Sequence, residues 1–384
     1  MSKTTTKKAR SRPEIKRIVF SGDFLRPSVA QFRPTQHENI QWLYRLLEVP
    51  LQMATGLPTE IVHWDNNWLN MSRIDRATAG AIYASFWQEP NINSWPHLFE
   101  AQELAPVVED MFLRFFEDSF VVGFELPPYL VHFLDRNGID FVDCSLSPIR
   151  FMDDLLFDVS ASTQDMTDAI RGYALPEALI RLQAGVVSSN VAKQNPRPPR
   201  PNSLLLILQT QFDKVVIENG RFSTVLDHLD AVMDLTQTYD HVIIKEHPLE
   251  PQKDVLERLT KLIPDNSVST DNFYVLVSHP NVQAVAALSS SCVLEAQYFG
   301  KDGHYLIPGF SHDSFSVGIE GFNIGDDVIM PDFWRDVLAS SNCPVTEKDG
   351  LRLGVKPNRF RQQIRSAWGY NQIDTDIPVR WAGH

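Results

Sequence analysis

Residues 193–208 read KQNPRPPRPNSLLLIL, a polar proline-rich segment followed at once by an aliphatic run. Prolines at 196, 198, 199 and 201 cannot continue a helix or sit in a central strand, so the segment predicts an extended linker over 193–202. The run LLLIL at 204–208 is as apolar as a strand buried on both faces of a parallel sheet. One domain is therefore expected to end before this segment and a second to begin after it.

Short apolar runs alternate with helix-like segments on both sides of the linker, which is typical of βα units around mainly parallel sheets. Prolines 127 and 128 predict the start of one helix, and Gly138 its end. The expected strands cover 17–20, 60–63, 120–123, 139–143 and 184–187 before the linker, and 204–208, 242–244, 284–288 and 304–307 after it. The fold class is therefore α/β, with two similar lobes and a ligand cleft between them.

The expected domain boundaries follow from these patterns. A basic disordered arm covers 1–16, the first lobe 17–192, the linker 193–202, the second lobe 203–355, and a C-terminal helix or tail 356–384 that packs back on the first lobe.

Composition excludes several classes of protein. The 384 residues carry a formal net charge of −13, which disfavours nucleic acid as a partner. Cys144, Cys292 and Cys343 lie far apart with no CxxC pair, so neither a zinc ribbon nor a disulfide framework is expected. No stretch of apolar residues is long enough to span a bilayer, and a cytoplasmic location is expected. The basic arm could lie against anionic lipid, although a solvated tail is the simpler interpretation.

Common catalytic signatures are missing from the chain. It has no GxGxxG, GxxxxGK[ST], HExxH or GxSxG motif, which removes the usual support for dinucleotide redox chemistry, P-loop hydrolysis, zincin proteolysis and nucleophile-elbow hydrolysis.

Polar residues that follow the expected strands are the candidates for function, because ligands of open α/β sheets bind beyond the carboxyl ends of the strands. Asp213 follows LLLIL and could act as a nucleophile or merely cap a turn. Glu125 follows the strand at 120–123 and could act as a general acid or base, or stabilise the dipole of the next helix. Gln209 begins the same loop as Asp213 and is expected to contact the donor.

A second group of candidates suits a phosphate. Ser289, Ser290 and Ser291 open a helix, where hydroxyl and free N–H groups can bind an anion or simply cap the helix, and Glu295 lies one turn further on. Lys245, His247 and Pro248 follow the strand at 242–244, where the imidazole could bind a phosphate or be structural.

The first lobe offers two more candidate loops. Asp23 and Arg26 follow the first strand and are expected to line the acceptor side of the cleft. Arg150, Asp153 and Asp154 form a charged cluster, which structural ion pairing explains nearly as well as function.

Four stretches together resemble the retaining β-Kdo glycosyltransferases of bacterial surface polysaccharide assembly, the glycosyltransferase family 99 type related to capsule β-Kdo transferases. They are GFELPPYL at 123–130, DCSLSPIRFMDDLLF at 143–157, LLLILQTQFDKVV at 204–216, and KEHP at 245–248 with SSSCVLEAQYFGK at 289–301. The His-Pro and serine-rich pieces also occur in bacterial transferases that use CMP-sialic acid.

The resemblance implies a GT-B architecture of two Rossmann-like lobes, with CMP-β-Kdo on the second lobe and a lipid-linked or oligosaccharide acceptor on the first. It implies Asp213 as the nucleophile and Glu125 as the base that activates the acceptor, with Asp227, Asp230 and Asp234 as alternatives to Asp213. His247 and the serine cluster would hold the phosphate, Glu295 would lie near the ribose, and Arg150 would neutralise the Kdo carboxylate. No metal or other cofactor is required by this scheme.

Two alternatives remain open at this point. A non-catalytic subunit that binds CMP-sugar or glycan would keep His247 and the serines but make Glu125 and Asp213 structural. A transferase that uses CMP-sialic acid would keep the chemistry and change the donor. The resemblance also implies peripheral contact with the inner face of the inner membrane or with other polysaccharide transferases, but it identifies neither the acceptor sugar nor the linkage.

Overall fold

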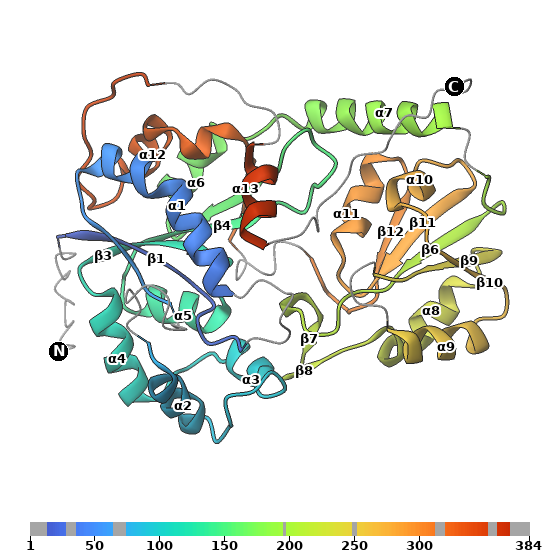
Figure 1. Cartoon of the computed structure of the whole chain (residues 1–384), viewed down its shortest axis with the longest axis horizontal. Helices are drawn as coiled ribbons and strands as arrows, with labels where there is room; N and C mark the ends of the chain where they lie inside the picture. The colour runs from blue at the N-terminus through green and yellow to red at the C-terminus, as the bar shows by residue number, and fades with distance from the viewer. Residues whose placement is uncertain are drawn as a thin grey trace, which may run out of the picture.

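The computed structural model describes residues 14–27, 36–63, 74–194, 197–247, 252–311, 319–351 and 359–368. Two α/β lobes lie side by side, each built on its own sheet (Figure 1). The expectation of two Rossmann-like α/β lobes is therefore confirmed.

The first lobe contains a six-stranded sheet in the order β13-β5-β4-β3-β1-β2. Its strands are β1 (Arg17–Gly22), β2 (Thr59–Ile61), β3 (Ser119–Phe124), β4 (Phe141–Leu146), β5 (Phe157–Ala161) and β13 (Phe322–Ile324). Strands β1 to β4 are parallel, and β5 runs antiparallel to both of its neighbours. The strand order reverses between β1 and β3, which is the place where such sheets bind ligands.

Helices cover both faces of this sheet because successive side chains of a strand point to opposite faces. Ile18 and Phe20 of β1 pack into one core with α1, α6, α12 and α13, whereas Val19 packs into another with α2 to α5. The helices are α1 (Gln36–Thr55), α2 (Arg76–Ser85), α3 (Trp95–Phe99), α4 (Pro106–Phe116), α5 (Pro128–Arg136), α6 (Gln164–Arg171), the 3₁₀ turn η4 (Asp326–Ile329), α12 (Pro331–Leu338) and α13 (Arg359–Trp368).

The second lobe contains a five-stranded parallel sheet in the order β10-β9-β6-β11-β12. Its strands are β6 (Ser203–Ile207), β9 (His241–Lys245), β10 (Asn266–Ser269), β11 (Val282–Ala287) and β12 (Asp302–Tyr305), and a small hairpin joins β7 (Ile217–Glu218) to β8 (Arg221–Phe222). This order reverses between β6 and β11. It is the arrangement of a Rossmann half-fold.

Helices also flank the second sheet on both faces. They are α7 (Glu177–Gln194), η1 (Lys214–Val216), η2 (Val225–His228), α8 (Leu229–Leu235), α9 (Lys253–Leu262), α10 (Phe273–Val277) and α11 (Ser291–Tyr298). Leu205 and Ile207 of β6 face α7, α10 and α11, whereas Leu204 and Leu206 face the opposite core.

One expected strand is wrong. The segment 184–187 lies inside α7, where Ile180, Ala184 and Val191 are buried. Their spacing of four and seven residues is the period of a helix, and the short run of apolar residues concealed it. The other expected strands overlap observed ones, while β5, β7, β8, β10 and β13 were not expected.

The lobe boundaries also differ from those expected. Helix α7 packs on α10 and α11 of the second lobe, so the chain leaves the first lobe between α6 and α7, well before the proline-rich segment. The chain returns at β13, which pairs with β5, and α12 then packs on α1 and α6. The two segments that connect the lobes are in contact, because the N–H of Leu175 donates to the carbonyl of Asn323 at 2.8 Å. A three-residue edge strand is too short to give a sequence signal.

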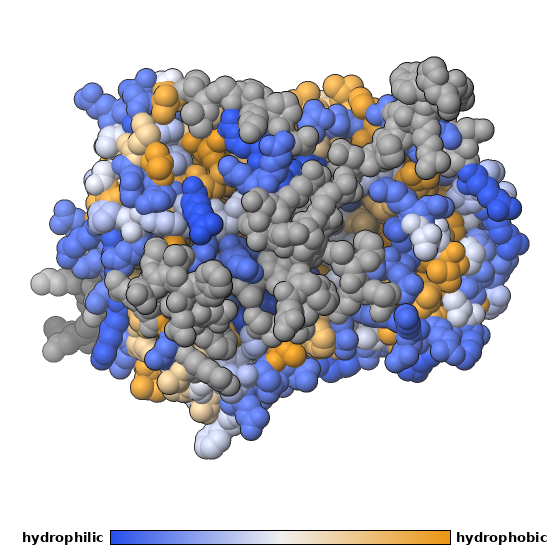
Figure 2. All heavy atoms as spheres, viewed as in Figure 1, coloured by the Kyte–Doolittle hydropathy of each residue, from blue (hydrophilic) through white to orange (hydrophobic). Residues whose placement is uncertain are grey.

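None of the helices in the described part of the chain is both long and apolar enough to cross a bilayer. Figure 2 shows hydrophilic residues over much of the coloured surface on this face, with hydrophobic residues in smaller groups.

Candidate active site at the lobe junction

The turn after β3 presents Glu125 at the point where the first sheet reverses its strand order. Glu125 has a φ of 53°, which is uncommon for a residue other than glycine. The turn is tight: a Cβ at Gly123 would lie 2.1 Å from Cγ of Leu126. Asp143 on the adjacent strand β4 accepts a hydrogen bond of 2.9 Å from the N–H of Leu126. The GFELPP stretch therefore forms a compact, strained turn.

The loop after β6 presents Asp213 from the second lobe. Oδ1 of Asp213 accepts from the N–H of Val215 at 3.4 Å, and this carboxylate caps the 3₁₀ turn η1. The turn-capping role that the sequence left open is thus present. Oδ2 accepts from the hydroxyl of Thr210 at 3.5 Å, so both oxygens have long hydrogen bonds, and the nucleophilic role stays a prediction.

An ion pair joins these two loops across the lobes. Nζ of Lys214 lies 3.1 Å from Oε2 of Glu125, and the two side chains are only 15% and 20% exposed. Lys214 follows Asp213 directly in the chain, so the contact brings the loop that carries Asp213 next to Glu125. We call the residues gathered here, Glu125, Arg150, Lys214, Tyr274 and Glu295, the lobe junction.

Arg150 enters the lobe junction on a loop whose neighbours are buried in the second lobe. Ile149 and Phe151 belong to the hydrophobic core of that lobe, and the ring of Phe151 lies 5.3 Å from that of Phe299. We call Ile149 and Phe151 the interlobe anchor. Burial lowers the pKa of Arg150, while the negative charges of Glu295 and Glu125 oppose that effect. Its Nη1 is buried and has no hydrogen-bond partner among the residues described.

Glu295 holds the same loop from the second lobe. It is 1% exposed, and its Oε1 accepts from the N–H of Arg150 at 2.7 Å and from the hydroxyl of Tyr274 at 2.9 Å. Burial raises the pKa of Glu295 to about 7, although both hydrogen bonds act in the opposite direction. The structure thus gives Glu295 a role in joining the lobes, and its expected contact with a ribose stays a prediction.

Gln209 and Ser289 lie at the strand-order reversal of the second sheet and bind each other. Oε1 of Gln209 accepts from the N–H of Ser289 at 2.8 Å, and Nε2 donates to the Ser289 hydroxyl at 3.1 Å. Both residues are buried. They therefore hold the ends of β6 and β11 together. Either side chain could contact a donor only if the hydrogen bonds between them were broken.

Ser290 and Ser291 remain accessible at the start of α11. Ser290 caps the helix by accepting from the N–H of Cys292 at 3.3 Å, and both serines are half-buried. At the end of β9, Lys245 and His247 are also half-buried, and burial lowers the pKa of Lys245. Pro248 lies outside the described residues.

Asp23 differs from its expected place on the acceptor side. It is 3% exposed, and its two oxygens accept from the indole N–H of Trp95 at 2.8 Å and the hydroxyl of Tyr129 at 3.0 Å. Burial raises its pKa. Asp23 is an internal brace, because a carboxylate engaged by two buried donors is not free to face an acceptor.

Arg26 does reach the other lobe. Its Nη2 donates to the carbonyl of Phe212 at 2.6 Å, one residue before Asp213, and its guanidinium lies 4.8 Å from the ring centre of Trp95. This contact holds the loop that carries Asp213. The hairpin β7–β8 adds a further contact between the lobes, because the N–H of Gly220 donates to Glu100 at 2.5 Å.

The charged residues Arg150, Asp153 and Asp154 contact different parts of the molecule. Asp154 accepts from the N–H groups of Phe360 and Arg361 at the start of α13, both at 2.9 Å. Arg361 donates to the carbonyls of Arg150 and Met152, and Asp153 accepts from Gln183 at 3.1 Å. Of the three charged residues expected together, only Arg150 belongs to the lobe junction.

Asp227, one of the alternatives to Asp213, makes local contacts of its own. It accepts from the N–H and hydroxyl of Thr224 at 2.8 and 2.9 Å and pairs with Arg221, contacts that lower its pKa against the opposing effect of burial. Asp230 is exposed at the start of α8.

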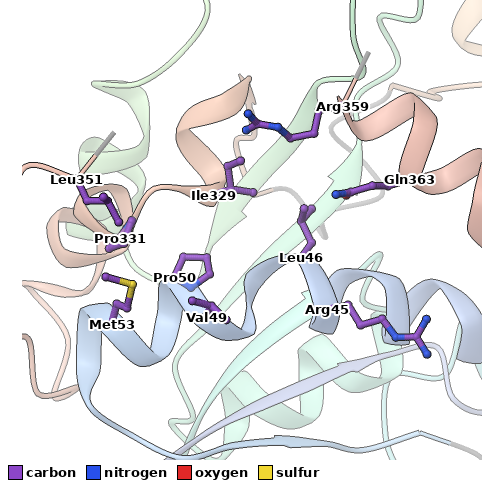
Figure 3. A pocket seen from close by; sticks show the side chains of 10 residues that line it. All are labelled: Arg45, Leu46, Val49, Pro50, Met53, Ile329, Pro331, Leu351, Arg359 and Gln363. Atoms are coloured by element: carbon purple, nitrogen blue, oxygen red, sulfur yellow. The ribbon is translucent and has the colours of Figure 1, made fainter. Parts of the chain in front are cut away.

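Within the described residues, no three His, Cys, Asp or Glu side chains are grouped so as to hold a metal ion. A cavity of about 460 Å³ lies in the first lobe, between α1, the segment around η4 and α12, and α13 (Figure 3). Apolar residues such as Leu46, Val49 and Pro50 line it together with Arg45 and Arg359. None of the residues proposed from the sequence lines this cavity.

Three functional candidates were missed in the sequence: Lys214, Asp143 and Tyr274. Lys214 follows Asp213 in QTQFDKVV, and Asp143 opens DCSLSP, so both lie inside stretches that carried the resemblance. Lys214 is adjacent to a residue already named, which was a usable signal, whereas Asp143 lies inside β4 rather than at its end. Tyr274 had no such signal, because only tertiary packing brings α10 to Glu295.

No known protein family profile matches this chain, and no curated protein sequence matches it. Among solved structures, the β-Kdo 2,7 transferase of KpsC from Thermosulfurimonas dismutans is 14% identical, with 67% of this chain and 92% of that one covered and a TM-score of 0.33. The β-Kdo 2,4 transferase of the same KpsC is 17% identical, with 51% and 72% covered and a TM-score of 0.31.

A UDP-GlcNAc 2-epimerase from Methanocaldococcus jannaschii, in complex with UDP-GlcNAc and UDP, is 13% identical, with 85% and 92% covered and a TM-score of 0.29. Identities and TM-scores this low say nothing about the chemistry of this chain, which has to be inferred from its own residues.

Proposed function

We propose that this protein is a retaining glycosyltransferase that transfers β-Kdo from CMP-β-Kdo to a sugar hydroxyl of a bacterial surface polysaccharide. The observation that carries the proposal is the contact of 3.1 Å between Glu125 and Lys214, which places one carboxylate of the first lobe beside the Asp213 loop of the second. Two carboxylates at one site are what a double displacement at a sugar carbon needs.

Asp213 is the nucleophile in this proposal. Its carboxylate attacks C2 of Kdo, the bond from C2 to the phosphate oxygen breaks, and CMP leaves with that electron pair. Glu125 then takes the proton of the acceptor hydroxyl, whose oxygen attacks C2 and releases Asp213. Two inversions at C2 give net retention.

Arg150 is the candidate for the carboxylate of Kdo. Its Nη1 is buried without a partner among the described residues, so an anion there would satisfy it. A guanidinium also suits a planar carboxylate, which it can bind through two parallel hydrogen bonds.

The CMP phosphate is assigned to the start of α11, with Ser290 and Ser291, and to Lys245 and His247 at the end of β9. These elements follow β11 and β9, the two strands that flank β6 in the second sheet, and a helix start supplies N–H groups to an anion. Those N–H groups can stabilise the leaving phosphate, so we keep metal independence as part of the proposal. A lipid-linked or oligosaccharide acceptor on the first lobe, and contact with the inner membrane, are likewise proposed.

The test is capture of the covalent intermediate. Glu125→Gln is incubated with CMP-Kdo generated in situ, and intact-protein mass spectrometry is expected to show one added Kdo residue, because the second step lacks its base. Peptide mapping should place the adduct on Asp213, and Asp213→Asn should lose it while Asp230→Asn, a change at an exposed aspartate, keeps it.

Other outcomes separate the alternatives. CMP binding without any CMP release or adduct would indicate a binding subunit, and product of inverted stereochemistry would overturn the double displacement. Turnover of CMP-sialic acid in preference to CMP-Kdo would change the donor.

A further inference from the structure

Asp143 lies beside the Glu125 turn on the neighbouring strand. It is paired in register with Gly123, and it is 6% exposed. Its Oδ1 accepts from the N–H of Leu126, the residue that follows Glu125, and its Oδ2 accepts from the hydroxyl of Ser145 at 3.3 Å. The carboxylate thus ties the end of β3 to β4.

The turn needs such a tie because its backbone is strained. Glu125 occupies the left-handed region at φ 53°, where a side chain is disfavoured. A buried N–H such as that of Leu126 must also find an acceptor, since helix α5 begins only at Pro128. Asp143 supplies that acceptor for Leu126, the residue next to the strained Glu125.

We propose that Asp143 is a positioning residue, which holds the strained turn so that the Glu125 carboxylate faces Lys214 and the sugar-transfer site. The inference rests on the proposed function for the role of Glu125, but the hydrogen bond to Leu126 can be tested without it. Asp143 itself contacts the turn and is given no part in proton transfer.

The charges around Asp143 agree with this role. Burial is the main reason that its pKa is raised to about 6, and the nearby charge of Glu125 acts in the same direction. The Leu126 N–H, Lys214 and the Ser145 hydroxyl act in the opposite direction. Burying a carboxylate costs free energy that an exposed one would not lose. The hydrogen bond to the N–H of Leu126 explains why a carboxylate is nevertheless buried at this position.

The experiment compares Asp143→Ala with Asp143→Asn, because an amide oxygen can still accept from Leu126 whereas alanine cannot. For Asp143→Ala we expect kcat to fall about 30- to 100-fold with the KM for CMP-Kdo changed by less than about threefold, which is the result of misplacing one group. Asp143→Asn should retain kcat to within about fivefold, because it keeps the geometry. Amide hydrogen exchange at Leu126 should be faster in Asp143→Ala and near wild type in Asp143→Asn.

Asp143→Ser replaces the alanine variant if that protein does not fold, since its hydroxyl is too short to span to Leu126. Unchanged kcat in the alanine or serine variant, or unchanged exchange at Leu126, would overturn the inference. Equal losses in the asparagine and alanine variants would overturn it too, because charge rather than the hydrogen bond would then be responsible. Absence of transfer by the wild-type protein would count against the proposed function, while the exchange measurement would still decide whether Asp143 holds the turn.

Discussion

Two of the contacts that join the lobes of this protein differ in chemistry. The interlobe anchor, Ile149 and Phe151, is apolar and belongs to the core of the other lobe. The ion pair between Glu125 and Lys214 is polar and partly exposed. An apolar contact gains free energy simply by excluding water, whereas a charge can exchange one partner for another. The comparison indicates that the anchor holds the lobes together and that the ion pair is the part available for chemistry.

The largest expected effect comes from breaking the anchor. Phe151→Ala removes a buried ring that packs on Tyr274, Tyr298 and Phe299, so the free energy of unfolding should fall by about 3 to 5 kcal/mol. Urea unfolding followed by circular dichroism measures the change. Val107→Ala, at a side chain 71% exposed, is the control and should alter it by less than about 0.5 kcal/mol. A similar small change for Phe151→Ala would mean that the anchor is not what stabilises the interface.

The next effect concerns Glu295, whose buried carboxyl group accepts from the N–H of Arg150, the residue between the two members of the interlobe anchor. Because the pKa of Glu295 is raised from 4.5 to about 7, the folded protein binds its proton more tightly than the unfolded chain does. Its contribution to stability is therefore fully present below about pH 4.5 and is lost as the pH rises through about 7.

Glu295→Gln should remove this dependence while keeping an acceptor for the N–H of Arg150. The free energy of unfolding of the variant, relative to wild type, should rise by up to about 3 kcal/mol between pH 5 and pH 8. Urea unfolding at both values measures it. A difference that does not change with pH would show that Glu295 does not titrate in this range.

A smaller effect is expected on the affinity for CMP at the proposed phosphate site, where the contacts are polar. His247→Ala should weaken binding of CMP by about 1 to 3 kcal/mol, because a phosphate would lose one donor. Isothermal calorimetry measures the affinity, and His132→Ala on α5 of the first lobe serves as the control. If the folded His247 variant binds CMP as tightly as wild type, His247 is not part of the donor site.

The smallest effect on folding is expected at the ion pair itself. Lys214→Met should change the free energy of unfolding by less than about 1 kcal/mol, as is usual for pairs near the surface. The rate of sugar transfer should nevertheless fall by about tenfold or more, because Glu125 loses the cation that orients it. Lys261→Met, in an exposed pair with Glu257, is the matched control for both measurements. Loss of stability without loss of transfer would reverse the roles given to the two contacts.

Much of the site could be read from sequence because it lies at strand ends. Glu125 and Asp213 each follow an aliphatic run that forms a buried strand, and parallel strands bring their carboxyl ends to one edge of a sheet. Asp23 and Gln209 satisfy the same rule and yet are internal braces. The rule locates an edge of the sheet, but it does not say which polar side chains turn inward.

The order of apolar runs, turns and prolines was enough to predict the α/β class, the two lobes and most of the strands, because these depend on local periodicity and on buried strands being aliphatic. The places where the chain crosses between lobes follow from the folded structure alone, since α7 and the short strand β13 are positioned by contacts with distant segments. The folded structure also decided that Lys214 meets Glu125 and that Asp143 braces the turn, because the pairing of charges and the satisfaction of a buried N–H depend on which side chains the folded lobes bring together.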